Sequence, residues 1–197
     1  MSTYEAIATE FQSLMELVSI SVDTLADPVQ QAVDLCQSAL LNEHKILCCG
    51  NGAGAMVAEL FSIGLLHRYE HDRPALPAIS LSADGATLSA LGTSSSSDLY
   101  ARQIRAIGQP GDLLLAVSAN DNANSLIQAV RAAHERDMLV VLLSGGECKD
   151  VSSLIALDDV EIYVNSFSAP RIIEVHTVIV HCLCKLIDQA LFGIYSS

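Results

Sequence analysis

The sequence predicts an α/β fold in which a parallel sheet of five strands lies between two layers of helices. A chain of 197 residues is enough for one domain, and with 51% apolar and only 17% charged residues it can bury a sizeable core. Five short apolar runs alternate along the chain with segments of helical periodicity. These runs are continuously apolar, which is typical of strands covered on both faces.

Residues 1–42 are expected to form two helices outside the sheet. Mostly apolar side chains repeat there at a heptad-like spacing, which gathers them into one stripe on a helix. The positions are Tyr4, Ile7, Phe11, Leu14, Val18, Ser21 and Leu25. Because such a stripe needs a partner, we expect one domain over residues 1–197, with residues 1–42 as a helical oligomerisation extension. The second helix is expected to begin near Pro28, behind Asp27 as N-cap, and to end at Asn42.

Strands and helices alternate through the rest of the chain. The expected strands are residues 45–49, 78–81, 112–118, 139–144 and 160–164. The expected helices are residues 53–69, 98–107, 122–135 and 170–192. Residues 93–97, a stretch of low complexity, are expected to form a loop.

The charge balance argues against several classes of partner. The chain has 10 Lys and Arg residues against 23 Asp and Glu residues, a net charge of -13, whereas nucleic acids and anionic membranes attract clustered basic side chains. A basic protein partner stays possible. The longest apolar run, residues 138–143, is too short to span a bilayer, and no Lys or Arg precedes Lys45, unlike the start of a signal peptide. We therefore expect a cytoplasmic protein.

The six cysteines lie mostly in apolar contexts. Cys48 and Cys49 are adjacent, and Cys182 and Cys184 point in different directions on a helix, which favours reduced core thiols over disulfides. Their spacing does not resemble that of a zinc site.

Two loops after expected strands have the composition of anion sites. Residues 50–54 read Gly-Asn-Gly-Ala-Gly and open a helix, so they could hold an anion on backbone N–H groups or simply form a tight turn. Residues 118–125 are small and polar, and they could bind a phosphate or cap the next helix. Asp121 favours capping, because its carboxylate would take up the same N–H donors and repel a phosphate.

Three segments together resemble the SIS domain family of phosphoheptose isomerases. They are residues 45–52 (KILCCGNG), 73–79 (RPALPAI) and 171–176 (RIIEVH), and the resemblance extends over nearly the whole chain. Residues 181–188 (HCLCKLID), with the following Leu191 and Phe192, resemble the last helix of the DnaA initiator-associating proteins within this family. The resemblance implies a three-layer αβα sandwich that assembles as a homotetramer through helices that include the N-terminal one.

The resemblance also places a zinc-binding catalytic centre at four positions of this chain. The isomerases carry a His and a catalytic Glu where this chain has Leu60 and Gly64, and a Gln and a His where it has Ile173 and His181. Glycine cannot abstract a proton, and aliphatic side chains cannot bind a metal. We therefore expect no zinc, no other cofactor and no zinc-dependent isomerisation. His181 alone survives from the catalytic set, and a hydrogen-bonded buried histidine is favoured there over a catalytic one.

The phosphate pocket implied by the resemblance is only partly kept. Gly54, Asn120 and Ala123 stand at serine positions of the isomerases, and Asp121 stands at a glycine position. Thr93 and Ser94 replace an Asn-Asp pair of the family. The residues expected to bind a ligand, a carbohydrate derivative, are Asn51, Gly52, Arg68, Asp84, Ser118 and Asn122. Arg68 could instead pair with Glu70 or Asp72, and the sequence leaves both roles open.

Two functions are implied. The first is a non-catalytic scaffold that binds the initiator DnaA and promotes replication initiation without touching DNA itself. Leu191 and Phe192 are its candidate contact, and packing within the tetramer is the alternative role for these two residues. The second function is a sedoheptulose 7-phosphate isomerase, or a protein that binds a phosphosugar without converting it.

Overall fold

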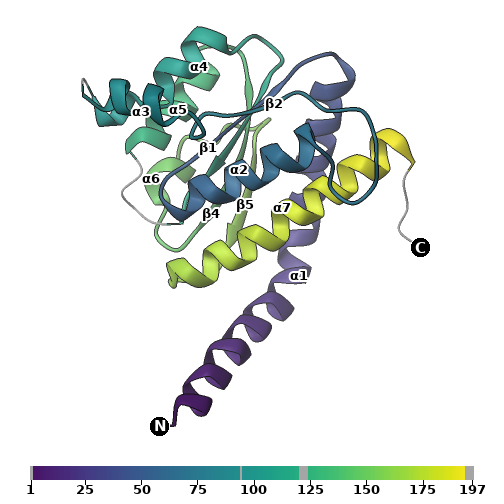
Figure 1. The fold of residues 1–197 in the computed structure, drawn as a ribbon, viewed down its shortest axis with the longest axis vertical. Helices are drawn as coiled ribbons and strands as arrows, with labels where there is room; N and C mark the ends of the chain where they lie inside the picture. Colours follow the sequence, from purple (N-terminus) through teal and green to yellow (C-terminus); the bar gives the residue numbers. More distant parts are fainter. Residues whose placement is uncertain (1, 94, 120–123, 194–197) are drawn as a thin grey trace.

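A five-stranded parallel sheet forms the centre of the molecule, which confirms the predicted α/β fold (Figure 1). The structure is a computed structural model that describes residues 2–93, 95–119 and 124–193. The strands are β1 (Ile46–Gly50), β2 (Ala78–Ser80), β3 (Leu113–Val117), β4 (Leu139–Gly145) and β5 (Val160–Val164). Their spatial order is β2-β1-β3-β4-β5, and Ile46 of β1 pairs with Ala78 and Leu113 on its two neighbours. All five lie close to their expected positions.

Helices cover both faces of the sheet. The first layer consists of α1 (Thr3–Leu41), α2 (Ala53–Leu66) and α7 (Ala169–Phe192). The second layer includes α4 (Ala101–Ile107), α5 (Asn124–His134) and α6 (Lys149–Ser152). Successive residues of β1 alternate between the two buried clusters, with Ile46 in the first and Leu47 in the second. This two-sided burial explains why the strands read as continuous apolar runs.

The N-terminal region departs from expectation, because it forms one helix and not two. α1 continues through Pro28 without a break, so Asp27 is not an N-cap. A proline inside a helix costs about 3 kcal/mol, since it removes a backbone N–H and crowds the preceding turn. Leu25, Val29 and Val33 lie on both sides of this proline and belong to the core cluster shared with α7 and β5. Their packing outweighs the local preference for a break.

The first turns of α1 project away from the rest of the molecule (Figure 1). Ser2 and Glu5 form a capping box that satisfies N–H groups at the helix start. Tyr4, Ile7 and Phe11, which belong to the predicted apolar stripe, are largely exposed. Ser21 and Leu25, at the other end of the stripe, are buried. Within the described chain, only the N-terminal part of the stripe is therefore left uncovered.

Two short helices escape prediction from the sequence. α3 (Gly85–Gly92) and α6 contain too few turns to produce a recognisable apolar period. The loop expected at residues 93–97 leads into a 3-10 turn at Ser96–Asp98, and Ser94 lies outside the described residues. The helix expected from residue 98 begins at Ala101.

Among the described residues, α7 alone has the length and hydropathy of a bilayer span. Of its most apolar window, 44% is buried inside the protein, and the helix packs against α1 and α2. A single helix of this kind is weak evidence for a membrane span, and its contacts with α1 and α2 place it in the core of the fold. The six cysteines are free thiols, as expected, and all except the exposed Cys182 are buried.

Candidate functional site

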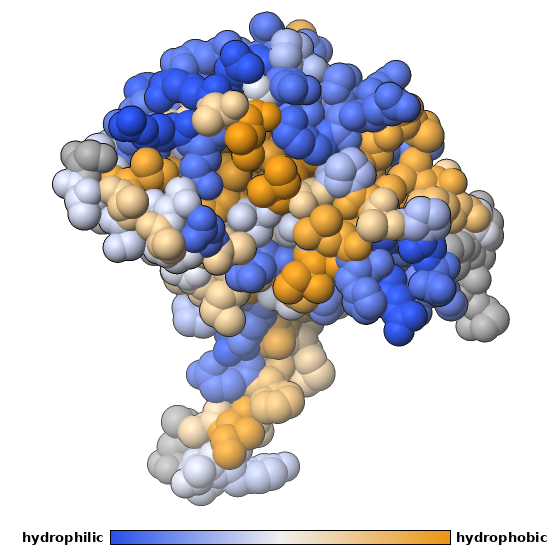
Figure 2. All heavy atoms as spheres, turned by 45° about the horizontal axis from the view of Figure 1, so that its top comes forward, coloured by the Kyte–Doolittle hydropathy of each residue, from blue (hydrophilic) through white to orange (hydrophobic). Residues whose placement is uncertain are grey.

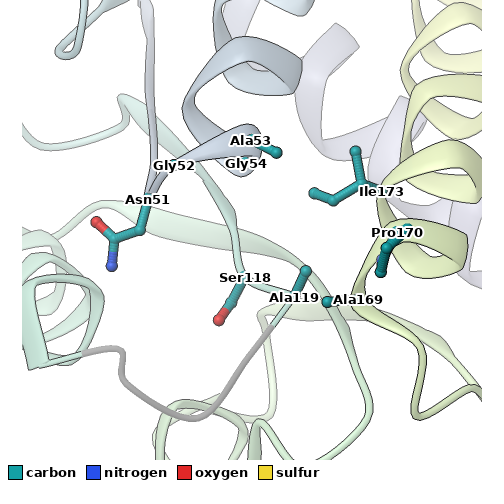
Figure 3. A pocket seen from close by; sticks show the side chains of 9 residues that line it. All are labelled: Asn51, Gly52, Ala53, Gly54, Ser118, Ala119, Ala169, Pro170 and Ile173. Atoms are coloured by element: carbon teal, nitrogen blue, oxygen red, sulfur yellow. The ribbon is translucent and has the colours of Figure 1, made fainter.

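A pocket lies at the carboxyl edge of the sheet, between β1 and β3. The strand order 2-1-3-4-5 sends the connections after these two strands to opposite faces, which opens a crevice where ligands bind in α/β proteins. The pocket has a volume of about 590 Å³. Its lining residues, drawn in Figure 3, are Asn51, Gly52, Ala53, Gly54, Ser118, Ala119, Ala169, Pro170 and Ile173.

Glycines shape the loop between β1 and α2. A Cβ atom on Gly50 would lie 2.4 Å from the backbone of Gly54, so the chain can turn this sharply only without a side chain there. Gly52 has a φ of 53°, in the left-handed region. Because Gly52 and Gly54 also line the pocket, this tight turn forms one wall of the pocket.

Helix starts meet at this pocket. α2 begins directly after Gly52 and α7 begins at Ala169, and among the described residues neither N-cap position, Gly52 or Ser168, supplies a side-chain capping hydrogen bond. Uncapped helix starts present N–H groups and the positive end of the helix dipole, which favour an anionic group. Asn122 and Asp121, on which the second predicted anion loop depends, lie outside the described residues.

Three of the predicted ligand residues come together here. Asn51, Gly52 and Ser118 line the pocket, and the Asn51 side-chain oxygen accepts a hydrogen bond from the Ser125 hydroxyl at 3.0 Å. Ile173 and Pro170 of α7 lie across the cavity from the loop after β1 (Figure 3). The wall that α7 contributes is therefore apolar, and the polar groups come from the carboxyl ends of β1 and β3.

Asp84 lies apart from this pocket. It is the N-cap of α3, where its carboxylate accepts hydrogen bonds from the backbone N–H groups of Ala86 and Thr87 and from the Thr87 hydroxyl. The hydrogen bond from the Thr87 side chain, followed by the one from its backbone, lowers the pKa of Asp84. The carboxylate oxygens of Asp84 are thus engaged in capping.

Arg68 lies at a second, smaller pocket between α2 and α7. This cavity of about 220 Å³ is lined by Leu60, Ile63, Gly64, Arg68, Tyr69, Val180, His181 and Cys184. The Arg68 guanidinium is half exposed and lies 3.9 Å from the Asp72 carboxylate, a loose surface ion pair. Of the two roles considered for Arg68, the structure contains the ion pair with Asp72.

His181 is exposed, so the prediction of a buried histidine at this position is wrong. The buried stripe of α7 contains Val180, Leu183 and Cys184, and one helical position of 100° turns His181 to the outer side. Its ring lies 5.7 Å from the ring of Tyr69.

The buried histidine of α7 is His176. Its Nε2 atom lies 3.0 Å from the Ser144 carbonyl oxygen, and its Nδ1 atom has no hydrogen-bond partner among the described residues. Burial lowers the pKa of His176 to about 4, against a smaller opposing effect of the hydrogen bond to Ser144. His176 is therefore neutral at physiological pH.

The residues at the four expected catalytic positions do not fit a zinc ion. Leu60, Gly64 and His181 surround the smaller pocket, and Ile173 lines the larger one, so the set offers a single imidazole. No group of three His, Cys, Asp or Glu side chains suited to a metal occurs in the described part of the chain. The position of Gly64 is also filled, because a Cβ atom there would lie 2.6 Å from the sulfur of Cys184.

Leu191 and Phe192 form the last turn of α7. Leu191 is half buried against the core, whereas 37% of Phe192 is exposed. The guanidinium of Arg73 lies 5.9 Å from the centre of the Phe192 ring. Arg73 and its partner Asp188 were absent from the predicted site, although an acidic residue one turn after Cys184 in the apolar stripe of α7 is a signal that could have found the pair.

Comparisons with known proteins agree with the resemblance seen in the sequence. Residues 11–145 match the SIS domain family. A phosphoheptose isomerase of Chromohalobacter salexigens is 42% identical over 98% of both chains. The DnaA initiator-associating protein DiaA of Photorhabdus laumondii is 43% identical over 87% of this chain and 88% of its own. The solved phosphoheptose isomerase of Francisella tularensis superimposes with a TM-score of 0.92 at 35% identity, covering 96% of this chain and all of that one.

Proposed function

The chain belongs to the SIS domain family, and we propose that within this family it is a non-catalytic scaffold that binds the initiator DnaA as a homotetramer and promotes replication initiation. A rigid oligomer that presents identical contacts raises the effective concentration of bound partners. The net charge of -13 suits a partner with a basic surface and keeps the scaffold itself away from DNA.

The observation that carries this proposal is the chemistry of the smaller pocket. Leu60 and Gly64 supply neither a base nor a metal ligand there, and Cys184 fills the space that a side chain on residue 64 would need. His181 is the remaining proton-transfer group of the expected set. Moving a proton between neighbouring carbons of a sugar needs a base close to the carbon. Tyr69 and Cys184 also line this pocket, but burial raises the pKa of both groups, which keeps them protonated and unsuited to act as a base.

Two separate apolar faces support a tetramer over a dimer. The first comprises the exposed part of the α1 stripe, at Tyr4, Ile7 and Phe11, and an apolar groove of about 280 Å³ between α1 and α7. The second lies on α2, where Met56, Ile63 and Leu66 are exposed. Figure 2 shows apolar side chains along the projecting α1 as well as on the body of the molecule. One two-fold interface makes a dimer, whereas a tetramer with dihedral symmetry needs two different ones.

The test is retention of purified DnaA by the immobilised full-length protein at low salt. We expect Phe192→Ala to lower retention at least tenfold, because a buried aromatic contact often supplies more than ~1.4 kcal/mol at an interface. Phe167→Ala is the matched control, since this exposed phenylalanine lies just before the start of α7, at the opposite end of the helix from Phe192. Light scattering checks that both variants keep the oligomeric state. If the wild type retains no DnaA, the proposal is wrong; if Phe192→Ala dissociates the oligomer, Phe192 is an assembly residue.

A phosphosugar ligand is the second candidate function, and the larger pocket favours it. Two uncapped helix starts and the polar residues Asn51 and Ser118 meet there, and relatives of this chain are named phosphoheptose isomerase. Under the scaffold proposal, calorimetry with sedoheptulose 7-phosphate at millimolar concentration should show no heat of binding. Binding without turnover would indicate a phosphosugar-binding protein, and zinc-dependent turnover would indicate an isomerase.

A further inference from the structure

Arg73 lies in the connection between α2 and β2, and all three nitrogens of its guanidinium group donate hydrogen bonds. Its side chain is 1% exposed. The Nε–H group donates to the Asp188 carboxylate at 2.9 Å. The two terminal nitrogens donate at 2.6 Å to the carbonyl oxygens of Gly64 and Leu65, near the end of α2. A single guanidinium thus joins two helices that are far apart in the sequence.

This arrangement suits arginine and no other side chain. The planar fork of guanidinium N–H groups can serve a carboxylate and two carbonyl oxygens at once, which a lysine ammonium cannot do with the same geometry. The carbonyl groups belong to a helix C-terminus, where a positive charge is favoured. Asp188 is itself buried, so the pair fixes the last turns of α7 against the last turn of α2.

Phe192 lies one helical turn after Asp188, on the same side of α7. Gly193 ends the helix with a φ of 65°, so Phe192 occupies a helix end, where residues ordinarily fray. The Arg73 guanidinium lies against its ring at 5.9 Å from the centroid, within the range of a cation–π contact. One part of the ring is therefore held, while the exposed part stays available.

We propose that Arg73, held by Asp188 and the end of α2, is a positioning residue that presents Phe192 in a fixed orientation to a protein partner. The inference rests on the proposed scaffold function, because that function makes Phe192 the contact. A preordered aromatic side chain binds more tightly than a mobile one, since its rotamer freedom is not lost on association. Arg73 itself does not touch the partner; it acts through Phe192.

The first test needs no partner. The four phenylalanines of the full chain are replaced by 4-fluorophenylalanine, and the ¹⁹F resonance of Phe192 is assigned by its loss in Phe192→Leu. In Arg73→Lys we expect this resonance to move toward the free amino-acid position and to narrow. The control is Arg136→Lys, since Arg136 donates two hydrogen bonds to the Gly108 carbonyl in the α4–α5 layer and should leave the signal unchanged. An unchanged Phe192 signal in a folded Arg73→Lys protein overturns the proposal.

The second test is a double-mutant cycle on DnaA binding. Arg73→Lys should weaken binding about three- to tenfold in the wild type, the range expected for loss of one ordered side chain. In the Phe192→Ala background the same substitution should change binding less than about twofold. A general structural role would lower binding equally in both backgrounds, and that result overturns the proposal. If the wild type does not bind DnaA, the scaffold function fails, and the fluorine signal still decides whether Arg73 orders Phe192.

Discussion

The two ends of α7 use polar groups in opposite ways. At its start, Ala169, Pro170 and Ile173 form an apolar wall of the larger pocket. Arg171 there forms ion pairs with Glu10 of α1 and with Glu174, two carboxylates that keep contact with water. At its end, the buried carboxylate of Asp188 is paired with the buried guanidinium of Arg73, which also donates hydrogen bonds to carbonyl groups of α2. The first end offers open space and few side-chain functions, whereas the second is closed and its polar groups are satisfied.

This difference indicates which residues of α7 can be replaced easily and which cannot. An open pocket tolerates an apolar residue such as Ile173 in its wall, since this side chain needs only to pack. A closed polar network tolerates much less, because removing one partner leaves the other buried without its hydrogen bonds. The comparison predicts unequal penalties for similar substitutions at the two ends.

The largest penalty is expected for Arg73→Ala. It leaves the Asp188 carboxylate buried and unpaired, which typically destabilises a protein by about 3–5 kcal/mol. Arg171→Ala is the matched substitution at the other end of α7, and it should cost only about 1 kcal/mol, because both of its partners, Glu10 and Glu174, keep contact with water. Urea unfolding at one fixed protein concentration measures both, because assembly would otherwise shift the values. Equal losses would show that the two ends do not differ in this way.

An effect of intermediate size is expected from pH at His176, in the pocket half of α7. Because burial lowers its folded pKa to about 4 from an unfolded value near 6.5, the unfolded chain binds the proton more strongly. Stability is therefore lost as pH falls, by about 2 kcal/mol between pH 7 and pH 5 for this one group.

His176→Gln is the variant that isolates this contribution. Glutamine cannot titrate, so its stability should fall about 2 kcal/mol less than that of the wild type over the same pH range. Urea unfolding of both proteins at pH 7 and pH 5 gives the difference. Parallel pH profiles would mean that His176 accepts a proton in the folded state as readily as in the unfolded chain.

The sequence predicts the sheet well and the N-terminal helix poorly, for a physical reason. Strands covered on both faces need continuous apolar runs, and that pattern is local, so all five strands could be placed. The break expected at Pro28 is also a local preference, but the burial of Leu25 and Val29 that overrides it depends on α7, far along the chain. Local patterns cannot reveal such long-range packing.

The candidate site likewise contains features that local sequence patterns predict and features that they do not. Asn51, Gly52 and Ser118 follow strands whose order brings them together, so their shared pocket could be predicted from parallel-sheet geometry. Arg73 and Asp188 lie in two of the segments that resemble the family, but 115 residues separate them, and neither segment by itself indicates that they pair. His181 points outward because it lies one residue away from the buried stripe of α7. The spacing of apolar residues locates such a stripe only to within about one residue, so it could not predict on which side His181 lies.

The smallest effect is expected where α2 meets α7, at Gly64 and Cys184, and its sign is informative. Alanine in place of glycine inside a helix ordinarily stabilises by about 1 kcal/mol. Here the new Cβ would lie 2.6 Å from the Cys184 sulfur, and such overpacking costs about 1–3 kcal/mol. Gly64→Ala should therefore destabilise the wild type by roughly 1 kcal/mol, the difference of the two contributions.

The same substitution should have the opposite sign in a Cys184→Ala background. Without the sulfur the overlap disappears, and only the gain in helix propensity, about 1 kcal/mol, is left. Thermal or urea unfolding of the four proteins completes the cycle. A sign change would establish that Cys184 fills the space beside Gly64, the position at which the family resemblance implies a catalytic glutamate, so that a carboxylate there would require Cys184 to move first. If Gly64→Ala destabilises both backgrounds equally, Cys184 does not block the position, and some other feature of α2 disfavours a side chain at residue 64.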